Sequence, residues 1–179
     1  MAPRIAVVSS DNRFLRWTDR REVHAEQLLH RSVQVLLWNR AGELLIQKRH
    51  RDKLTFPSTW DLSCAGHVEE PDYIAGPDDE LDRVYEEVAR RELFEELGVR
   101  VSVTPLGRFG PEPGVHYEQT CLFRAEHEGP FVCQEDEVEE VRFVTAEAFE
   151  ALVREGREKL TPSLVWFVAW ARAAGVTPW

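Results

Sequence analysis

The chain has 179 residues, enough for one domain with its own core, and its 43% hydrophobic and 30% charged residues are ordinary for a soluble protein. Its 32 acidic and 22 basic residues give a formal net charge of -10, which argues against a general nucleic-acid binder or a membrane-surface binder. A small anionic substrate held through a metal ion is still allowed. We expect a single domain over residues 1–179.

The cysteines and the hydropathy pattern bear on the cellular setting. Cys64, Cys121 and Cys133 are an odd number without metal-finger spacing, so each is expected to be a small core residue. The sequence has no signal peptide and no apolar run long enough to span a bilayer. We therefore expect a reducing cytoplasm.

The first part of the chain is expected to be rich in strands. β-Branched and aromatic segments predict strands at residues 5–8, 14–17, 31–39, 43–48 and 60–65. Residues 1–30 would form a hairpin and a connector, and the strand at 60–65 would stop at Gly66. The acidic segment 69–79, which contains proline and glycine, is expected to be a surface loop.

The second part of the chain adds helices one at a time. A helix is expected at residues 80–97, with Asp78 or Asp79 as its cap. Strands are expected at 101–109, 116–125 and 141–144, and helices at 146–154 and 162–174, the last within a C-terminal segment 161–179. Hairpins with single inserted helices favour a mixed sheet covered on both faces.

The stretch from Arg91 to Val99 concentrates negative charge. It sets Glu92, Glu95 and Glu96 at positions i, i+3 and i+4, which point the same way on a helix. Such like charges repel unless a cation lies among them, and carboxylate oxygens suit Mg²⁺ or Mn²⁺. The alternative is an ordinary solvated helix face that ends at a glycine cap.

The same stretch resembles the second half of a Nudix box, G-x5-E-x7-R-E-U-x-E-E-x-G-U, where U is a bulky aliphatic residue. Upstream segments H-R-S-V, G-E-L-L-I-Q-K-R and A-G-H are similar to the branch of Nudix proteins that includes isopentenyl-diphosphate isomerase and its hydrolase relatives. The resemblance covers roughly residues 20–145. It implies the Nudix α/β/α sandwich, an α/β fold with a mixed central sheet.

The box departs from its pattern in two places. The early glutamate of the pattern is Arg83 here, which puts the docking of the helix in question. Gly66 lies 25 residues before Arg91, where the pattern has 14. Residues 66–99 would thus be a modified box with an inserted loop at 69–79, which could cover the site or widen it.

The resemblance implies a role for each residue of the box. Glu92 is the expected general base, and Arg91 is expected to orient the carboxylates. Glu92, Glu95 and Glu96 are expected to bind the metal, together with the backbone carbonyl of Gly66. Diphosphate cleavage needs cations that neutralise charge and a positioned water, which this set would supply.

Four other residues are expected on the substrate side of the site. Arg49 and Lys53 match diphosphate-contacting positions of the isomerase, although they could equally be surface cations. His67 and Glu118, with His30, match ligands of the isomerase's own metal site, although ordinary loop or strand residues are the alternative. His24 lies one residue out of register with a further ligand.

The isomerase moves a double bond with a cysteine and a glutamate. Ala65 stands at the cysteine's position, with Cys64 one residue earlier, and Gln119 stands at the glutamate's position, where it cannot serve as acid or base. We therefore expect a Mg²⁺- or Mn²⁺-dependent hydrolase of a nucleoside diphosphate or related diphosphate. The isomerase and a non-catalytic Nudix-like binding module are the alternatives.

No motif selects the leaving group. Four aromatic residues could stack on a base, namely Trp17, Phe109, Tyr117 and Trp166. A core role is the commoner one for aromatic residues at these spacings. A homodimer is compatible with the family.

Overall fold

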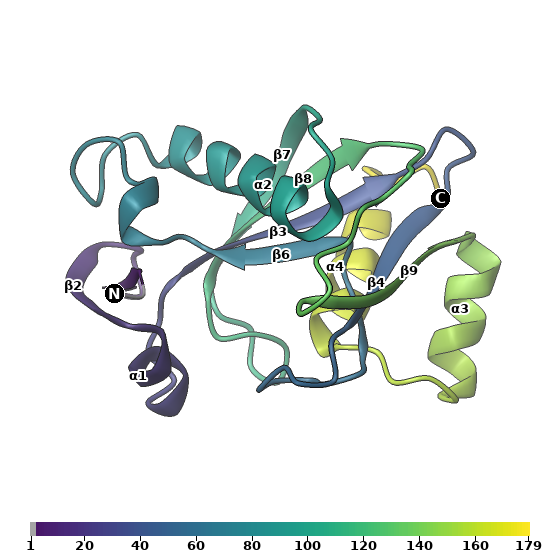
Figure 1. Cartoon of the computed structure of the whole chain (residues 1–179), viewed down its shortest axis with the longest axis horizontal. Coiled ribbons are helices and arrows are strands. Elements are labelled where there is room, and N and C mark those ends of the chain that lie inside the picture. Colours follow the sequence, from purple (N-terminus) through teal and green to yellow (C-terminus); the bar gives the residue numbers. More distant parts are fainter. Residues whose placement is uncertain (1–2) are drawn as a thin grey trace.

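The strands of the protein form one mixed sheet of seven and one separate hairpin (Figure 1). The computed structural model describes residues 3–179, so the first two residues of the expected N-terminal segment lie outside it. The elements are β1 (Arg4–Val8), β2 (Phe14–Asp19), α1 (Arg20–Ala25), β3 (Arg31–Trp38), β4 (Leu44–Arg49), β5 (Trp60–Asp61), β6 (Cys64–His67), the 3₁₀ turn η1 (Glu70–Asp72), α2 (Leu81–Leu97), β7 (Val103–Phe109), β8 (Gln119–Glu126), β9 (Val138–Val144), α3 (Ala146–Glu155) and α4 (Pro162–Ala173).

The large sheet divides into two halves that meet at one end of β3 and β4. Its main path is β5-β4-β3-β8-β7, with β6 beside β3 and β9 beside β4. β3 runs parallel to β8, and the other pairs are antiparallel. Because β3 and β4 pair only at Trp38 and Leu44, the two strands diverge from there, and β6 takes the place of β4 along the first half of β3.

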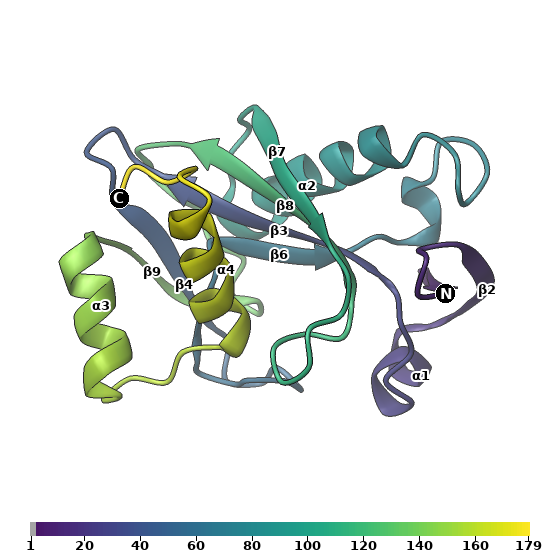
Figure 2. The same ribbon diagram turned by 180° about the vertical axis from the view of Figure 1, so that it is seen from behind.

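Helices cover both faces of this sheet. Along β3, Val33 and Val35 pack in the cluster that contains α2, whereas Leu36 and Trp38 pack in the cluster that contains α4. This alternation follows from the opposite directions of successive side chains in a strand. Figures 1 and 2 show α2 and α4 on opposite sides of the strands. The expected α/β/α sandwich with a mixed central sheet is present.

The start of α2 differs from the expectation. Neither Asp78 nor Asp79 caps it; the capping position is Glu80, in a left-handed conformation with φ 48° and no side-chain cap. The carboxylate of Asp78 instead accepts a hydrogen bond from the backbone N–H of Phe14 at 2.9 Å. The Asp78 carboxylate, which the local sequence predicts as a helix cap, therefore makes a tertiary contact instead. The helix ends as expected, at Gly98 with φ 71°.

Two strand expectations also change. Residues 60–65 are divided between β5, which pairs with β4, and β6, which pairs with β3. Ser63 lies at the crossing, where its hydroxyl accepts from the backbone of β3 and donates to the backbone of β4. Gly66 lies inside β6 instead of ending the strand. The connector before β3 contains the short helix α1, which buries Val23.

The three cysteines are free thiols. Cys64 and Cys121 are buried beside α2, as expected, and Cys133 is half-buried. Within residues 3–179, no helix combines the length and apolarity that crossing a lipid bilayer requires.

Candidate functional site

A cleft of about 1190 Å³ opens beside the C-terminal half of α2. Its walls come from α1, the loop after β4, β6, α2 and the segment that leads into β8. Every residue that the sequence assigns to the site lines this cleft, namely Arg49, Lys53, Gly66, His67, Arg91, Glu92, Glu95, Glu96 and Glu118. Residues far apart in the sequence are thus brought to one surface.

The three α2 glutamates occupy different environments in the cleft. Glu96 is buried, and its carboxylate accepts a hydrogen bond from Gln47 Nε2 at 3.0 Å. Glu92 is half-buried and Glu95 is exposed. Burial raises the pKa of Glu96 and raises the pKa of Glu92 to about 8, against an ordinary value of 4.5. The carboxyl groups of Glu92 and Glu96 are therefore poorly solvated and would gain from a nearby cation.

Gly66 makes room for Glu92. A Cβ atom added at Gly66 would lie 2.0 Å from Cδ of Glu92, so any side chain there would displace the carboxylate. The expected contact between the Gly66 carbonyl and a metal stays a prediction. The close approach of Glu92 gives a separate physical reason for a glycine at this position.

Arg91 lies between the helix glutamates. Its Nη1 is 3.0 Å from Oε1 of Glu92 and 2.8 Å from Oε2 of Glu95. Its Nη2 donates to the backbone carbonyl of His67 at 3.3 Å and to the carboxylate of Asp72 at 3.1 Å. A guanidinium group with these partners contacts two carboxylates at once. The expected role of Arg91 in orienting them stays a prediction.

A second group of potential ligands lies in the same cleft. The ligand atoms of His30, His67 and Glu118 all lie within 4.8 Å of one another, whereas the three α2 glutamates form no such group in the described chain. Nδ1 of His30 is 2.8 Å from the carbonyl of Leu28, so the hydrogen-bond pattern assigns the proton to Nδ1. The buried Nε2 then carries the lone pair and has no hydrogen-bond partner within residues 3–179. Burial also lowers the pKa of His67 well below its usual range, which favours the neutral, ligating form.

Besides Arg91, four cationic side chains line the cleft, namely Arg20, Arg21, Arg49 and Lys53. Arg49 pairs with Asp61 at 3.0 Å, and Lys53 pairs with Glu137. Arg20, at the start of α1, lines the same cleft, is exposed and has no ion pair among the described residues. Sequence reasoning missed Arg20 because it treated this segment as a connector; Asp19, a good capping residue, was the available sign of a helix.

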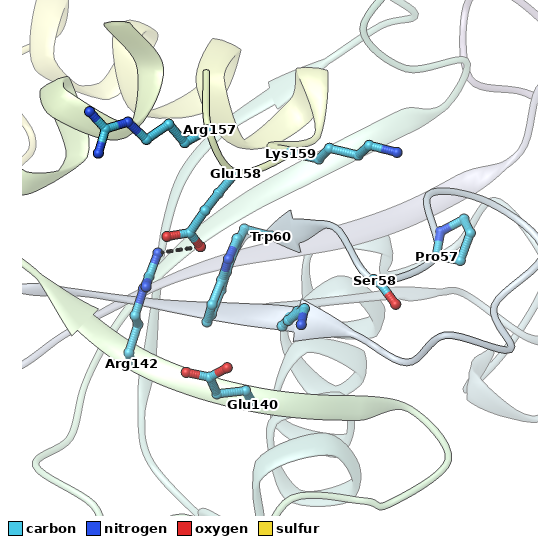
Figure 3. Close-up of a pocket in the computed structure, with 9 residues that line it drawn as sticks. Pro57, Ser58, Trp60, Glu140, Arg142, Arg157, Glu158 and Lys159 are labelled. Atoms are coloured by element: carbon cyan, nitrogen blue, oxygen red, sulfur yellow. Dashed lines mark hydrogen bonds and ion pairs between the residues drawn. The ribbon is translucent and has the colours of Figure 1, made fainter. Parts of the chain in front are cut away.

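A smaller cavity of about 420 Å³ lies on the other face of β4 (Figure 3). Lys48 lines it, whereas the neighbouring Gln47 points to α2, because successive strand residues face opposite ways. Figure 3 shows Arg142 beside Trp60, with its guanidinium pointing to Glu158, and the guanidinium is 2.8 Å from the glutamate carboxylate. In this smaller cavity Lys48 is paired with Glu139 and Arg142 with Glu158. The α2 cleft is therefore the better candidate for a functional site.

The NUDIX domain family matches residues 28–164. The chain belongs to the Nudix family. An uncharacterized Nudix hydrolase of Pseudomonas aeruginosa is 37% identical over 145 residues, which are 80% of this chain and 79% of that protein. Nudix membership places the chain among enzymes that hydrolyse phosphorus-containing anhydrides, and such enzymes generally use divalent metals.

Other relatives of this Nudix chain include isomerases and solved structures. Isopentenyl-diphosphate Delta-isomerase I of Arabidopsis thaliana is 33% identical over 168 residues, which are 82% of this chain and 54% of the isomerase, so the chain spans about half of that relative. The DR0079 structure from Deinococcus radiodurans has a TM-score of 0.77 at 24% identity and covers 93% of this chain and 97% of its own. The NUDIX domain of Shewanella oneidensis NrtR, in complex with ADP ribose, has a TM-score of 0.60 at 16% identity and covers 88% and 99%. The two structures show that the fold is shared.

The positions that resemble the isomerase's catalytic pair offer different groups in this Nudix cleft. Ala65 lines the cleft, whereas Cys64 is fully buried in the α2 cluster. Gln119 is also buried, and its Nε2 donates to the carbonyl of Ser10 at 2.8 Å. Neither position presents an acid or a thiol to the cleft.

Of the aromatic residues considered for base stacking, Tyr117 lines the cleft and is 54% exposed. Trp17 packs on Phe14 and Tyr73, and Trp166, a residue of α4, packs on Phe109. Phe109 also packs with α4. Sequence reasoning missed Phe56, which lines the cleft at 49% exposure.

The raised pKa of Glu92 predicts a pH-dependent stability. Between pH 4.5 and about 8 the folded Nudix protein keeps a proton that the unfolded chain releases, so the free energy of unfolding falls as pH rises through this window. Glu92→Gln should therefore stabilise the metal-free protein at pH 8 by about 2 kcal/mol, after a discount for solvent screening, and change little at pH 4.5. Urea unfolding at both pH values measures this, with the exposed Glu95→Gln as control. Destabilisation by Glu92→Gln at pH 8 would show that the Arg91 ion pair outweighs burial.

Proposed function

We propose that this Nudix protein is a Mg²⁺-dependent hydrolase that cleaves the phosphoanhydride bond of a nucleoside diphosphate or related diphosphate. The observation that carries the proposal is the half-buried Glu92, held against Gly66 in the cleft, with Glu95 and Glu96 on the same helix face. Mn²⁺ is the other ion that this oxygen donor set fits. The three free cysteines support a reducing, cytoplasmic setting.

Different residues of the cleft would have different roles in hydrolysis. Glu95 and Glu96 would hold the metal with Glu92, and a bound divalent ion would supply positive charge to the phosphoryl oxygens. Glu92 would accept the proton of the attacking water, because its carboxylate lies in the cleft beside the proposed metal ligands Glu95 and Glu96. Arg91 would hold the direction of the Glu92 carboxylate.

The cleft cations would bind the anionic substrate. Arg20 has no ion pair among the described residues, so its charge is available to a phosphate group. We expect Arg20→Ala to raise KM about tenfold, equivalent to roughly 1.4 kcal/mol, with kcat changed less than twofold. Steady-state kinetics measure this, and Arg90→Ala, which removes an exposed cation paired with Glu86 on α2, is the control. Equal KM values for the two variants would remove Arg20 from the substrate site.

The second candidate is a diphosphate isomerase of the isopentenyl type. It is favoured by the His30, His67 and Glu118 group, whose two imidazoles and one carboxylate suit Zn²⁺ or Mn²⁺ better than Mg²⁺. It is disfavoured because Ala65 and the buried Gln119 provide no proton donor or acceptor. A binding module without turnover is the third candidate.

A substrate screen separates these candidates. Nucleoside di- and triphosphates, dinucleotides, sugar nucleotides and isopentenyl diphosphate would each be incubated with Mg²⁺, with phosphate-containing products followed by ³¹P NMR and double-bond migration by ¹H NMR. Our proposal expects hydrolysis of a nucleoside diphosphate or related diphosphate. Isomerised isopentenyl diphosphate without hydrolysis would establish the second candidate, and binding without any product would establish the third.

A further inference from the structure

The guanidinium group of Arg91 is held from two sides. On one side lie Glu92 and Glu95 of its own helix, at 3.0 and 2.8 Å. On the other side lies Asp72, which accepts from Nε at 3.1 Å through Oδ1 and from Nη2 at 3.1 Å through Oδ2. This fork-to-fork geometry is the strong, directional form of an arginine–carboxylate pair. Asp72 belongs to the inserted loop 69–79, outside the helix.

The carboxylate of Asp72 is itself fixed. Its Oδ2 accepts from the backbone N–H of Glu69 at 2.8 Å, and its own N–H donates to the Glu69 carbonyl at 3.0 Å. Only 14% of the Asp72 side chain is exposed. The aspartate therefore offers Arg91 one position and one orientation, which a solvated loop carboxylate would not do.

The loop that carries Asp72 is fastened to the N-terminal hairpin. Ile5 of β1 forms a β-bridge with Glu69, next to η1. At the far end of the loop, Asp78 accepts from the N–H of Phe14 and pairs with the fully buried Arg31 at 2.6 Å. The hairpin precedes residues 28–164, which the NUDIX domain family matches. It nevertheless braces both ends of a loop that touches the site.

The helix itself offers no substitute for Asp72. Arg83 stands where the box pattern has its early glutamate, and its side chain is 60% exposed and pairs with Glu80 and Glu87. Within residues 3–179, Asp72 is the one carboxylate outside α2 that bonds to Arg91.

We propose that Asp72 is a positioning residue: the inserted loop supplies a carboxylate that holds Arg91 and, through it, sets Glu92 and Glu95 for the metal and the attacking water. This inference rests on the proposed metal-dependent function. Without the charge of Asp72, the guanidinium would be drawn fully to Glu92 and Glu95, where it would compete with a divalent cation. In this proposal the inserted loop helps to organise the metal site, and it acts neither as a lid nor as a spacer.

Asp72→Asn tests this with a readout that does not need turnover. The test is made on full chains that all carry Glu118→Gln, so that the His30, His67 and Glu118 group does not hold the ion. In this background we expect Mn²⁺, measured alone by electron paramagnetic resonance, to bind the Asp72→Asn chain about 10 to 100 times more weakly, the usual cost of losing a group that orients a ligand. Asp79→Asn is the matched control, because this carboxylate of the same loop bonds only to the N–H of Gly76. It should change Mn²⁺ affinity less than twofold. Unchanged Mn²⁺ affinity in Asp72→Asn, or an equal loss in both variants, would overturn the inference.

A double-mutant cycle separates positioning from a general loss of structure. If Asp72 acts through Arg91, then Asp72→Asn should add little to the loss of Mn²⁺ affinity already caused by Arg91→Lys, since lysine cannot make the bidentate pair. Fully additive losses would overturn the inference. If Asp72→Asn does not fold, Arg91→Lys alone decides, and wild-type affinity in that variant would refute the role. A wild-type protein that binds Mn²⁺ but hydrolyses nothing would contradict the proposed function and leave this affinity test intact.

Discussion

Replacing Glu92 with glutamine is expected to lower the kcat for diphosphate hydrolysis by about a thousandfold, within the range of a lost general base. Glutamine has nearly the same shape, so it should keep the close packing against Gly66, but it cannot accept the proton of the attacking water. KM should change much less, because the substrate's phosphates would be bound by the cleft cations. Steady-state kinetics with Mg²⁺ measure both constants.

The control for this variant is its stability. A folded Glu92→Gln protein should unfold at a higher urea concentration than wild type at pH 8 without metal, since burial penalises the wild-type carboxylate. Loss of activity together with loss of structure would not count as loss of a base. Activity within about tenfold of wild type would move the role of base to another group.

Replacing Glu96 with glutamine is expected to lower turnover by at least roughly a hundredfold without unfolding the protein, the scale of losing a key charged group. Glu96 is buried and accepts from Gln47 Nε2, and the amide oxygen of a glutamine could accept the same bond. The core should therefore survive while one negative charge at the metal site is lost. A Mg²⁺ titration of the rate should show weaker metal activation.

A folded Glu96→Gln variant with near wild-type turnover and unchanged Mg²⁺ activation would refute our assignment of Glu96 to the metal. Because the donor group of His30, His67 and Glu118 lies in the same cleft, such a result would direct attention to it.

Local patterns in the sequence predicted the helix of the box and the strands around it. The three glutamates at i, i+3 and i+4 share one helix face because the helical backbone fixes the direction of each side chain. The end of α2 was predictable because glycine readily adopts the left-handed conformation that closes a helix. The burial of β3 on both faces was visible in its apolar, β-branched content. These features depend on residues that are close in sequence, so they can be predicted from the sequence.

The partners of the site residues depend on contacts between distant segments. Asp78 had the composition of a helix cap but pairs with Arg31, 47 residues away, and Asp72 bonds to Arg91 across 19 residues. No periodicity encodes such pairs, because the energy of an ion pair does not depend on sequence separation. The division of residues 60–65 between two strands was likewise hidden, since it follows from the divergence of β3 and β4.

The most direct test of the account is the ³¹P NMR spectrum of a nucleoside diphosphate incubated with Mg²⁺ and either the wild-type protein or Glu92→Gln. We predict that the wild type converts the two diphosphate signals into those of a nucleoside monophosphate and inorganic phosphate, and that the variant leaves them nearly unchanged. Equal conversion by both proteins would contradict the role of Glu92. No conversion of any diphosphate by a folded, metal-loaded wild type would contradict the proposed hydrolase itself.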